Sequence, residues 1–414
     1  MKYVVVGAGP AGVTAVEILR AGDPEADILL VGDEPGPAYS RMAIPYLLAG
    51  DIEESGTHLR QQPGHFENLG IERLQAKVTA VAPDTRTLIL DDGSQRAYDR
   101  LLIATGSRPV TPPIDGLKGP RVQHCWTLAD ARAIADKAQP GSRVTLMGAG
   151  FIGCIILEAL VKRGVELTVI EMGDRMVPRM MDQTAGNLLK RWCQEKGVAV
   201  HTSTRIESVA LKADGSLQVH CDTTDPVATD LLVVAAGVRP QIEFLGSSSI
   251  ETGQGIQVDE YLQSSLSGVY AAGDVCETHD WSSGEPTVMA IQPVAVETGR
   301  VAALNMLGRT TPYQGALAMN VLDTLGLISA SFGLWMGVEN GQQAEVLDDA
   351  GYRYIRLQFD EDRLVGAIAL GMTEHVGVLR GLIQGRVALG EWKMRLISDP
   401  TRIMEAYLAR CAFA

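Results

Sequence analysis

Short, unbroken apolar runs recur along the chain, and the clearest ones lead into a glycine-rich turn followed by a helical pattern. Lys2–Val6 is the first such run and precedes a helix expected over Ala11–Ala21. Val144–Met147 is the second and precedes a helix expected over Ile152–Arg163. Continuous apolar runs are typical of parallel strands that helices cover on both faces. The pattern therefore predicts an α/β fold.

The first turn carries glycines at the spacing of a dinucleotide fingerprint, followed by the residues that open the helix: Gly7, Gly9, Pro10, Ala11 and Gly12. In such a turn the first glycine permits the tight bend and the second lets a pyrophosphate approach the backbone. The third glycine lets the helix pack close to the strand. The N-terminal N–H groups of the helix then face the phosphates. We expect a dinucleotide site here.

The second turn repeats this spacing and its helix opening: Gly148, Gly150, Phe151, Ile152 and Gly153. The strand Glu166–Ile170 then delivers Glu171 about 20 residues after the glycines, where a carboxylate accepts a ribose 2′-hydroxyl. A carboxylate at this place repels a 2′-phosphate, so NADH is favoured over NADPH. Arg175 lies nearby and could soften that preference.

Two later segments mirror one another. Leu101–Pro109 and Leu231–Pro240 each combine an apolar strand, small residues and a Gly-x-Arg-Pro ending. This internal repeat predicts two related Rossmann-like nucleotide domains in one chain. The small residues let the backbone approach a planar ligand, so the candidate set includes these positions: Ala104, Thr105, Gly106 and Gly237.

Other candidates belong to the first nucleotide site. Asp33 and Glu34 end the strand Asp27–Val31, where ribose hydroxyls should lie. Pro35–Gly50 is too irregular to be a core element, and its Arg41 either clamps a diphosphate or forms a surface ion pair. The remaining candidates are Val78, the Gly273-Asp274 pair at a strand end, and Gln292-Pro293 at the start of a helix expected over Ala290–Leu307.

Prolines between apolar segments and a change in the pattern of expected strands and helices predict that the chain has three parts. Residues 1–112 and 246–312 would form a discontinuous first nucleotide domain, residues 113–245 the second, and residues 313–414 an α+β appendage. Within the first part, Ile71–Val81 and Thr87–Leu90 suggest a small antiparallel layer. The appendage is expected to contain four strands and two helices: Asn320–Leu327, Ser329–Leu334, Tyr352–Phe359, Leu364–Leu370, Thr373–Ala388 and Pro400–Cys411. Packing and a homodimer interface are its expected roles.

Composition excludes some function classes. The formal net charge of -14 argues against nucleic-acid binding, which needs a basic surface, although it leaves open a basic protein partner. Apolar runs fall short of the ~20 residues that span a bilayer, and Met1 leads directly into the first strand, so we expect a cytoplasmic protein. The six cysteines show neither a C-x-x-C pair nor metal-ligand spacing, so no metal site is expected.

The ordered motifs resemble those of the pyridine nucleotide–disulfide oxidoreductase superfamily. They are Gly7-Ala-Gly-Pro-Ala-Gly12, Ala104-Thr-Gly106, Gly148-Ala-Gly-Phe-Ile-Gly153 and Ala272-Gly-Asp274. Within that superfamily the chain resembles NADH oxidases, coenzyme A disulfide reductases, ferredoxin and rubredoxin reductases, and the flavin module of nitrite reductases. The resemblance implies FAD on the first fingerprint, NADH on the second and a C-terminal interface domain. It also implies that Phe151 covers the flavin and swings aside for nicotinamide.

Two departures narrow the chemistry. Relatives that reduce disulfides or peroxide carry a cysteine where this chain has Met42 or its neighbours, and a thioether cannot become a thiolate nucleophile. Ile155 stands where many relatives carry a glutamate near the flavin. We therefore expect an FAD-dependent NADH:acceptor oxidoreductase whose chemistry is flavin-centred, with no catalytic side chain and an iron–sulfur protein as the leading acceptor.

Three alternatives stay open at this point. The first is an NADH oxidase or a reductase of a small acceptor. The second is a flavin subunit of a larger dehydrogenase complex, and the third is a flavoprotein whose redox state regulates a binding partner. The contributions of His279 and Trp281, in the loop Cys276–Pro286, are also left open.

Overall fold

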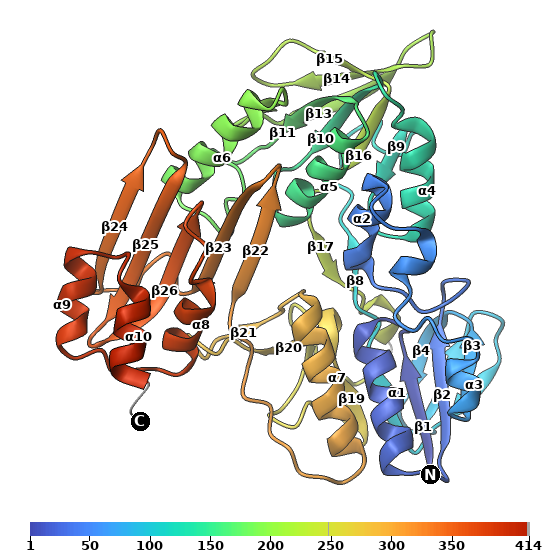
Figure 1. Ribbon diagram of the computed structural model, residues 1–414. Coiled ribbons are helices and arrows are strands. Elements are labelled where there is room, and N and C mark those ends of the chain that lie inside the picture. The colour runs from blue at the N-terminus through green and yellow to red at the C-terminus, as the bar shows by residue number, and fades with distance from the viewer. Residues whose placement is uncertain (247, 412–414) are drawn as a thin grey trace.

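A computed structural model describes residues 1–246 and 248–411. Figure 1 shows three parts, each built around its own sheet: one carries the N-terminus and the helices α1 and α7, one carries α4 to α6, and one carries α8 to α10. The first two sheets are parallel and the third is antiparallel. The expected α/β architecture with two Rossmann-like units and a C-terminal appendage is confirmed.

The first parallel sheet gathers strands from both ends of a long sequence interval. Its order is β19 (Val269–Ala271), β7 (Arg100–Ile103), β1 (Lys2–Val6), β2 (Asp27–Gly32) and β3 (Ile71–Gln75). Helices α1 (Pro10–Gly22) and α7 (Gln292–Met306) pack against each other beside it, and α3 (His65–Asn68) contacts β3. The pairing of β19 with β7 brings the segment after residue 246 back to the N-terminal sheet.

The second parallel sheet is made from one continuous stretch. Its order is β12 (Ala199–His201), β11 (Glu166–Ile170), β10 (Arg143–Met147), β16 (Leu231–Val234) and β9 (Val122–His124). Three helices belong to this part: α4 (Leu128–Lys137), α5 (Phe151–Lys162) and α6 (Gln183–Glu195). The apolar strand β16 is buried along its whole length, and β10 and β11 each bury three of their five residues.

Smaller antiparallel sheets decorate and connect these units. They are β4 (Val78–Ala82), β5 (Thr87–Leu90) and β6 (Gln95–Ala97); β13 (Ile206–Leu211), β14 (Leu217–Cys221) and β15 (Val227–Thr229); and β20 (Cys276–His279) with β21 (Pro286–Thr287) and, in parallel, β18 (Ile256–Gln257). The strands β8 (Ser107–Pro109) and β17 (Val238–Pro240) pair across the two nucleotide units. Short 3-10 turns cover Glu54–Thr57, Glu243–Leu245 and Gly273–Val275.

Two expectations in the first unit need correction. Residues 71–81 are not one strand, because β3 joins the parallel sheet while β4 belongs to the antiparallel layer. The segment 35–50 is also more than irregular surface chain. After a 3-10 turn over Arg41–Ala43 it forms α2 (Ile44–Ala49), which starts with proline in its first turn and ends on the left-handed Gly50. Ile44 and Leu48 are buried against the second unit.

The C-terminal part is a five-stranded antiparallel sheet with three helices. Its order is β22 (Met319–Thr324), β23 (Leu327–Gly333), β26 (Arg363–Leu370), β25 (Arg353–Asp360) and β24 (Gln342–Asp348), with α8 (Val376–Gln384), α9 (Glu391–Ser398) and α10 (Ile403–Cys411). The strand β24 and the helix α9 were not expected from the sequence, and α8 is shorter than the helix expected over Thr373–Ala388. In β24 only Ala344 is buried, so this edge strand has too few apolar positions to give a strand pattern in the sequence.

Among the described helices, none combines the length and the apolar character that a bilayer span requires. Within the same residues, His, Cys, Asp and Glu side chains form no group of three or more that could hold a metal ion.

Candidate cofactor site

A cavity of about 520 Å³ lies where the first parallel sheet meets the start of α5. It joins residues from both nucleotide units, since its wall includes the first fingerprint and also Phe151 from the second. The sequence-predicted residues that line it are Gly7, Gly9, Pro10, Ala11, Asp33, Glu34, Arg41, Ala104, Thr105, Gly106, Phe151, Ile152, Gly273, Asp274 and Gln292. Residues separated by more than 280 positions in sequence therefore share one enclosure.

The three glycines of the first fingerprint have different surroundings. A Cβ on Gly7 would lie 2.0 Å from the carbonyl oxygen of Ala104, and one on Gly12 would lie 1.9 Å from that of Gly7. A Cβ on Gly9 would meet no atom within 4 Å, because this residue faces open space. The outer glycines thus fix the close approach of strand, turn and helix, and the middle one leaves room for a ligand at the N-terminus of α1.

The second fingerprint repeats this division. A Cβ on Gly148 would lie 2.5 Å from the carbonyl oxygen of Ala235, and one on Gly153 would lie 2.2 Å from that of Gly148. Gly150 again faces open space. The two turns are therefore alike in their packing as well as in their spacing.

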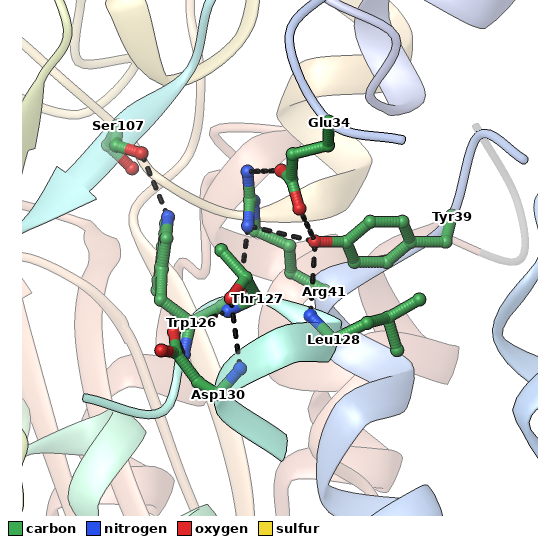
Figure 2. A network of polar contacts seen from close by, with 8 residues as sticks. All are labelled: Glu34, Tyr39, Arg41, Ser107, Trp126, Thr127, Leu128 and Asp130. Carbon is green, nitrogen blue, oxygen red and sulfur yellow. Dashed lines mark hydrogen bonds and ion pairs between the residues drawn. The ribbon is translucent and has the colours of Figure 1, made fainter. Parts of the chain in front are cut away.

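Arg41 stands at the centre of a polar network on the cavity wall (Figure 2). Its Nη2 donates to the Glu34 carboxylate at 2.6 Å, and its Nη1 donates to the carbonyl oxygen of Trp126 at 2.7 Å. The guanidinium carbon lies 5.6 Å from the Tyr39 ring centroid and 5.3 Å from that of Trp126. The Tyr39 hydroxyl donates to Glu34 and accepts from the backbone N–H of Leu128. The network thus pins the first unit to the start of α4.

A second polar chain starts from the same tryptophan. The indole N–H of Trp126 donates to the carbonyl oxygen of Ser107 at 2.9 Å, and the Ser107 hydroxyl donates to the Asp274 carboxylate at 2.7 Å. Burial raises the pKa of Asp274 above its ordinary value, although the bond from Ser107 opposes this effect. The surroundings of the Asp274 carboxylate therefore disfavour its charged form, and the Ser107 hydroxyl donates a hydrogen bond to it.

Three residues of these networks escaped the sequence analysis: Tyr39, Ser107 and Trp126. Ser107 lies inside the repeated Gly-x-Arg-Pro segment, where its hydroxyl was a usable signal. Trp126 directly precedes Thr127, whose side chain caps α4 in a capping box with Asp130. Neither Tyr39 nor Trp126 carries a sequence signal of its own, because their partners are defined only by the tertiary fold.

The remaining wall of the cavity is largely apolar. The apolar lining includes Met42, Ile44, Pro45, Ile152 and Ile155. Cys125 also lines the cavity, but burial raises the pKa of its thiol to about 12. A thiol with that pKa stays protonated at neutral pH, so it lacks the thiolate that redox or nucleophilic chemistry needs.

The other predicted residues lie outside the lining of this cavity. Val78 is the first residue of β4 and is buried. Pro293 borders a shallow groove that shares Gln292 with the cavity. Gly237 connects β16 to β17. Glu171 is 8% exposed and accepts from the backbone N–H groups of Ala149 and Gly173, both at 2.7 Å. The contact with Ala149 places Glu171 directly against the second fingerprint.

The two aromatic residues left open by the sequence lie elsewhere. Trp281 packs against the C-terminal core, with the Arg386 guanidinium carbon 5.0 Å from its ring centroid. His279 stacks edge-on against Tyr313. Both contribute to packing near the C-terminal part and neither lines the cavity.

Comparison with known proteins places this geometry in a family. The family model described as pyridine nucleotide-disulphide oxidoreductase matches residues 1–299, and the chain belongs to that family. It is an NAD(P)H-dependent flavin oxidoreductase. The expected kinship is thereby confirmed, including relatives named as NADH oxidases, ferredoxin reductases and nitrite reductase.

Two relatives and one solved structure illustrate the range of proteins to which this chain is similar. Subunit epsilon of an NADH-dependent phenylglyoxylate dehydrogenase from Aromatoleum evansii is 29% identical over 97% of this chain and 96% of its own. The ferredoxin–NAD(+) reductase component of the anthranilate 1,2-dioxygenase system of Burkholderia cepacia is 32% identical over 75% of this chain and 77% of its own. The crystal structure of the covalent putidaredoxin reductase–putidaredoxin complex shares the fold, with a TM-score of 0.89, 24% identity and 98% coverage of both chains.

Proposed function

We propose that this protein is an FAD-dependent NADH:acceptor oxidoreductase that delivers electrons to an iron–sulfur protein. One observation carries the proposal: the wall of one cavity includes both Gly9 of the first fingerprint and Phe151 of the second. A nucleotide held on either turn would extend toward the same enclosed space. Donor and acceptor groups that must exchange electrons would therefore meet there.

The residues present fit an FAD molecule. Gly9 leaves room for a diphosphate at the N-terminus of α1, and Glu34 and Asp274 would accept hydrogen bonds from ribose and ribitol hydroxyls. The N-terminus of α7, beside Gln292, would stabilise negative charge on a reduced ring. When bound, the flavin supplies two-electron acceptance from a nicotinamide and onward electron delivery. Arg41 would reach a diphosphate by exchanging Glu34 for phosphate oxygens.

The second fingerprint would hold NADH. Glu171 lies against the turn, and its carboxylate would accept a ribose 2′-hydroxyl and repel a 2′-phosphate. Phe151 begins α5 and lines the cavity, so its ring would cover the flavin until a nicotinamide displaces it. The apolar wall around Ile155 would exclude water from the reacting groups.

The iron–sulfur acceptor is favoured by what the cavity lacks and by the relatives. The thioether of Met42 and the protonated thiol of Cys125 leave no side-chain relay for electrons in the cavity wall. A relative named as a ferredoxin–NAD(+) reductase component is 32% identical. These observations support direct transfer from the flavin to a one-electron protein acceptor.

A second candidate function is that of a flavin subunit in a larger dehydrogenase. The Aromatoleum evansii relative is named as such a subunit and aligns along almost its whole length with almost all of this chain. We further propose the three-part division at residues 1–112 with 246–312, 113–245 and 313–414, which the membership of the three main sheets supports. Dimerisation through the last part and a cytoplasmic location remain predictions from the sequence.

Anaerobic stopped-flow reduction with NADH and NADPH tests the enzyme proposal. We expect the flavin to bleach within seconds with NADH and more slowly with NADPH; bleaching slower than minutes with both would overturn the proposal. Steady-state NADH consumption is then compared for oxygen, a [2Fe–2S] ferredoxin and a rubredoxin. Turnover with oxygen as fast as with either protein would favour an NADH oxidase, and co-purification with stoichiometric partner chains would favour the subunit role.

A further inference from the structure

The loop between β11 and α6 folds back onto the second fingerprint. The N–H of Val177 donates to the carbonyl oxygen of Ala149 at 2.8 Å, while the N–H of Ala149 donates to Glu171 at 2.7 Å. Val177 is buried and has a φ of +44°, a left-handed conformation that β-branched residues rarely adopt. Since such a conformation persists only where surrounding contacts enforce it, the loop is held in one defined shape.

Arg175 adds side-chain contacts from inside the loop to the backbone bonds that Met180 and Met181 donate to Val177. Its Nε donates to the carbonyl oxygen of Met181 at 2.8 Å, its Nη2 to that of Pro178 at 3.3 Å, and its Nη1 to the Asp174 carboxylate at 2.7 Å. Its side chain is only 22% exposed. The stem packs on α6 at Gly186, where an added Cβ would lie 2.8 Å from the Arg175 Cβ. The guanidinium is thus committed to the loop itself.

The loop is also anchored at its far end. Asp182 caps α6 by accepting from the N–H of Ala185 at 2.9 Å. The other oxygen of the same carboxylate accepts from the Tyr354 hydroxyl at 2.8 Å and from Arg356 at 3.0 Å, both on β25 of the C-terminal sheet. Glu171 at the start and Asp182 at the end therefore leave Arg175 as the brace between two fixed points.

We propose that Arg175 is a positioning residue that makes the site selective for NADH by holding this loop, and through it Glu171, against the second fingerprint. The inference rests on the proposed function, in which Glu171 meets the ribose of the nicotinamide nucleotide. Arg175 follows Glu171 by four residues, and the sequence made it a candidate receiver for the 2′-phosphate of NADPH. To act as one it would have to give up three hydrogen bonds and approach the carboxylate that repels the phosphate. The arginine therefore enforces discrimination instead of relaxing it.

The test uses the FAD-loaded protein and two probes without a nicotinamide, ADP-ribose and 2′-phospho-ADP-ribose. In Arg175→Met we expect ADP-ribose affinity to fall about tenfold, the effect of losing one well-made charged hydrogen bond. We expect the affinity for 2′-phospho-ADP-ribose to stay unchanged or rise. Calorimetric titration measures both. A fall for the phosphorylated probe alone, with ADP-ribose binding unchanged, would identify Arg175 as a phosphate receiver and overturn the inference.

Kinetics separate positioning from general damage. The KM for NADH should rise in parallel with the ADP-ribose dissociation constant, while the limiting rate of flavin reduction stays within about twofold, as expected for lost uniform binding. Arg179→Met is the matched control, since Arg179 is an exposed arginine of the same loop, and it should leave the KM for NADH unchanged. An equal rise in KM for both variants would overturn the inference.

A double variant tests whether the effect passes through Glu171. In a Glu171→Ala background, Arg175→Met should add less than about twofold to the loss of ADP-ribose affinity, because coupled residues are not additive. Fully additive losses would contradict the inference. If Arg175→Met does not fold, Arg175→Lys keeps the stem and one donor and should show a smaller loss in the same direction. Failure of the unmutated protein to bind ADP-ribose or to bleach with NADH would overturn the proposed function instead.

Discussion

The guanidinium of Arg41 lies 2.6 Å from the carboxylate of Glu34 on the wall of the cavity. The sequence offered two roles for Arg41, a diphosphate clamp and an ion pair, and Glu34 was an expected ribose acceptor. The structure joins these residues before any nucleotide is considered. Each one satisfies the charge of the other, so nucleotide binding at this site would exchange one set of polar partners for another.

Replacing Arg41 with methionine should weaken FAD binding more than it weakens the fold. The change removes a charged donor from the cavity and leaves Glu34 to repel a diphosphate. We expect the FAD dissociation constant to rise about tenfold, or ~1.4 kcal/mol. A larger effect is not expected because both side chains are about one-third exposed, so water screens their interaction. Fluorescence of released FAD measures the constant.

The control for that experiment is Arg132→Met. Arg132 also pairs with a glutamate, Glu54, at 2.6 Å, but it lies outside the cavity lining and is more exposed. Its loss should leave FAD affinity within about twofold. Equal weakening by the two variants would indicate that overall charge, and not the cavity network, sets the affinity.

The glycines of the first fingerprint should respond to alanine in opposite ways. In Gly12→Ala the new methyl group would lie 1.9 Å from the carbonyl oxygen of Gly7, so the backbone must shift and the apoprotein should lose about 1–3 kcal/mol or more. In Gly9→Ala the methyl group enters open space, and stability should change by less than about 1 kcal/mol.

Gly9→Ala, unlike Gly12→Ala, is expected to fold normally while failing to retain FAD, because its methyl group occupies the space that a diphosphate would use. Thermal unfolding of the apoproteins and the FAD content of the purified proteins measure the two effects. A normal FAD content in Gly9→Ala would contradict the assignment of this turn to the diphosphate.

Local signals predicted the two turns well. The spacing of Gly7, Gly9 and Gly12, and of their later counterparts, is visible within six residues, and the close approaches of Gly12 to Gly7 and of Gly153 to Gly148 are equally local. The parallel sheets followed from unbroken apolar runs. The strand β24 escaped because it is an exposed edge strand in which one residue is buried. The helix α2 escaped because it is only six residues long, with Pro45 in its first turn and Gly50 directly after its end.

The polar networks of the site were beyond such signals. Arg41 and Trp126 are 85 positions apart in the sequence, and Ser107 and Asp274 are 167 apart. Nothing local to either member of a pair specifies the other. The contact between Arg41 and Trp126 exists only once the two nucleotide units pack together, and that between Ser107 and Asp274 only once the segment after residue 246 returns to the first unit. The chemistry of each residue could be guessed from its type, but its partner could not.

The charged carboxylate of Asp274 should destabilise the folded apoprotein at neutral pH. Its pKa in the folded protein is raised above the ordinary value of 3.8 by burial, so the folded state binds the proton more tightly than the unfolded state does. Stability then falls as pH rises from 3.8 through the raised pKa, and the penalty is complete above it. Asp274→Asn keeps an acceptor for Ser107 and removes the charge.

We therefore expect the Asp274→Asn apoprotein to unfold about 1–2 °C higher than the unmutated apoprotein at pH 7, with the gap narrowing as the pH is lowered. FAD affinity should fall about tenfold, because the amide N–H of the new asparagine cannot accept a hydrogen bond from a ribitol hydroxyl. Calorimetric unfolding of both apoproteins across pH checks the first effect. A gap that widens on acidification would show that the carboxylate is stabilised by the fold.

The last prediction concerns the route by which electrons leave the cavity. Cys125 and Met42 are its sulfur-bearing wall residues, and the pKa of about 12 of the Cys125 thiol and the thioether chemistry of Met42 disqualify both as relays. Cys125→Ser and Met42→Leu should each keep ferricyanide reduction within about twofold of the unmutated rate. Anaerobic titration should consume about one equivalent of NADH per flavin, since only the flavin takes up electrons. Uptake of a second equivalent that disappears in Cys125→Ser would instead reveal that Cys125 is present in an oxidised form that NADH reduces, and would place this chain with the disulfide-reducing branch of its family.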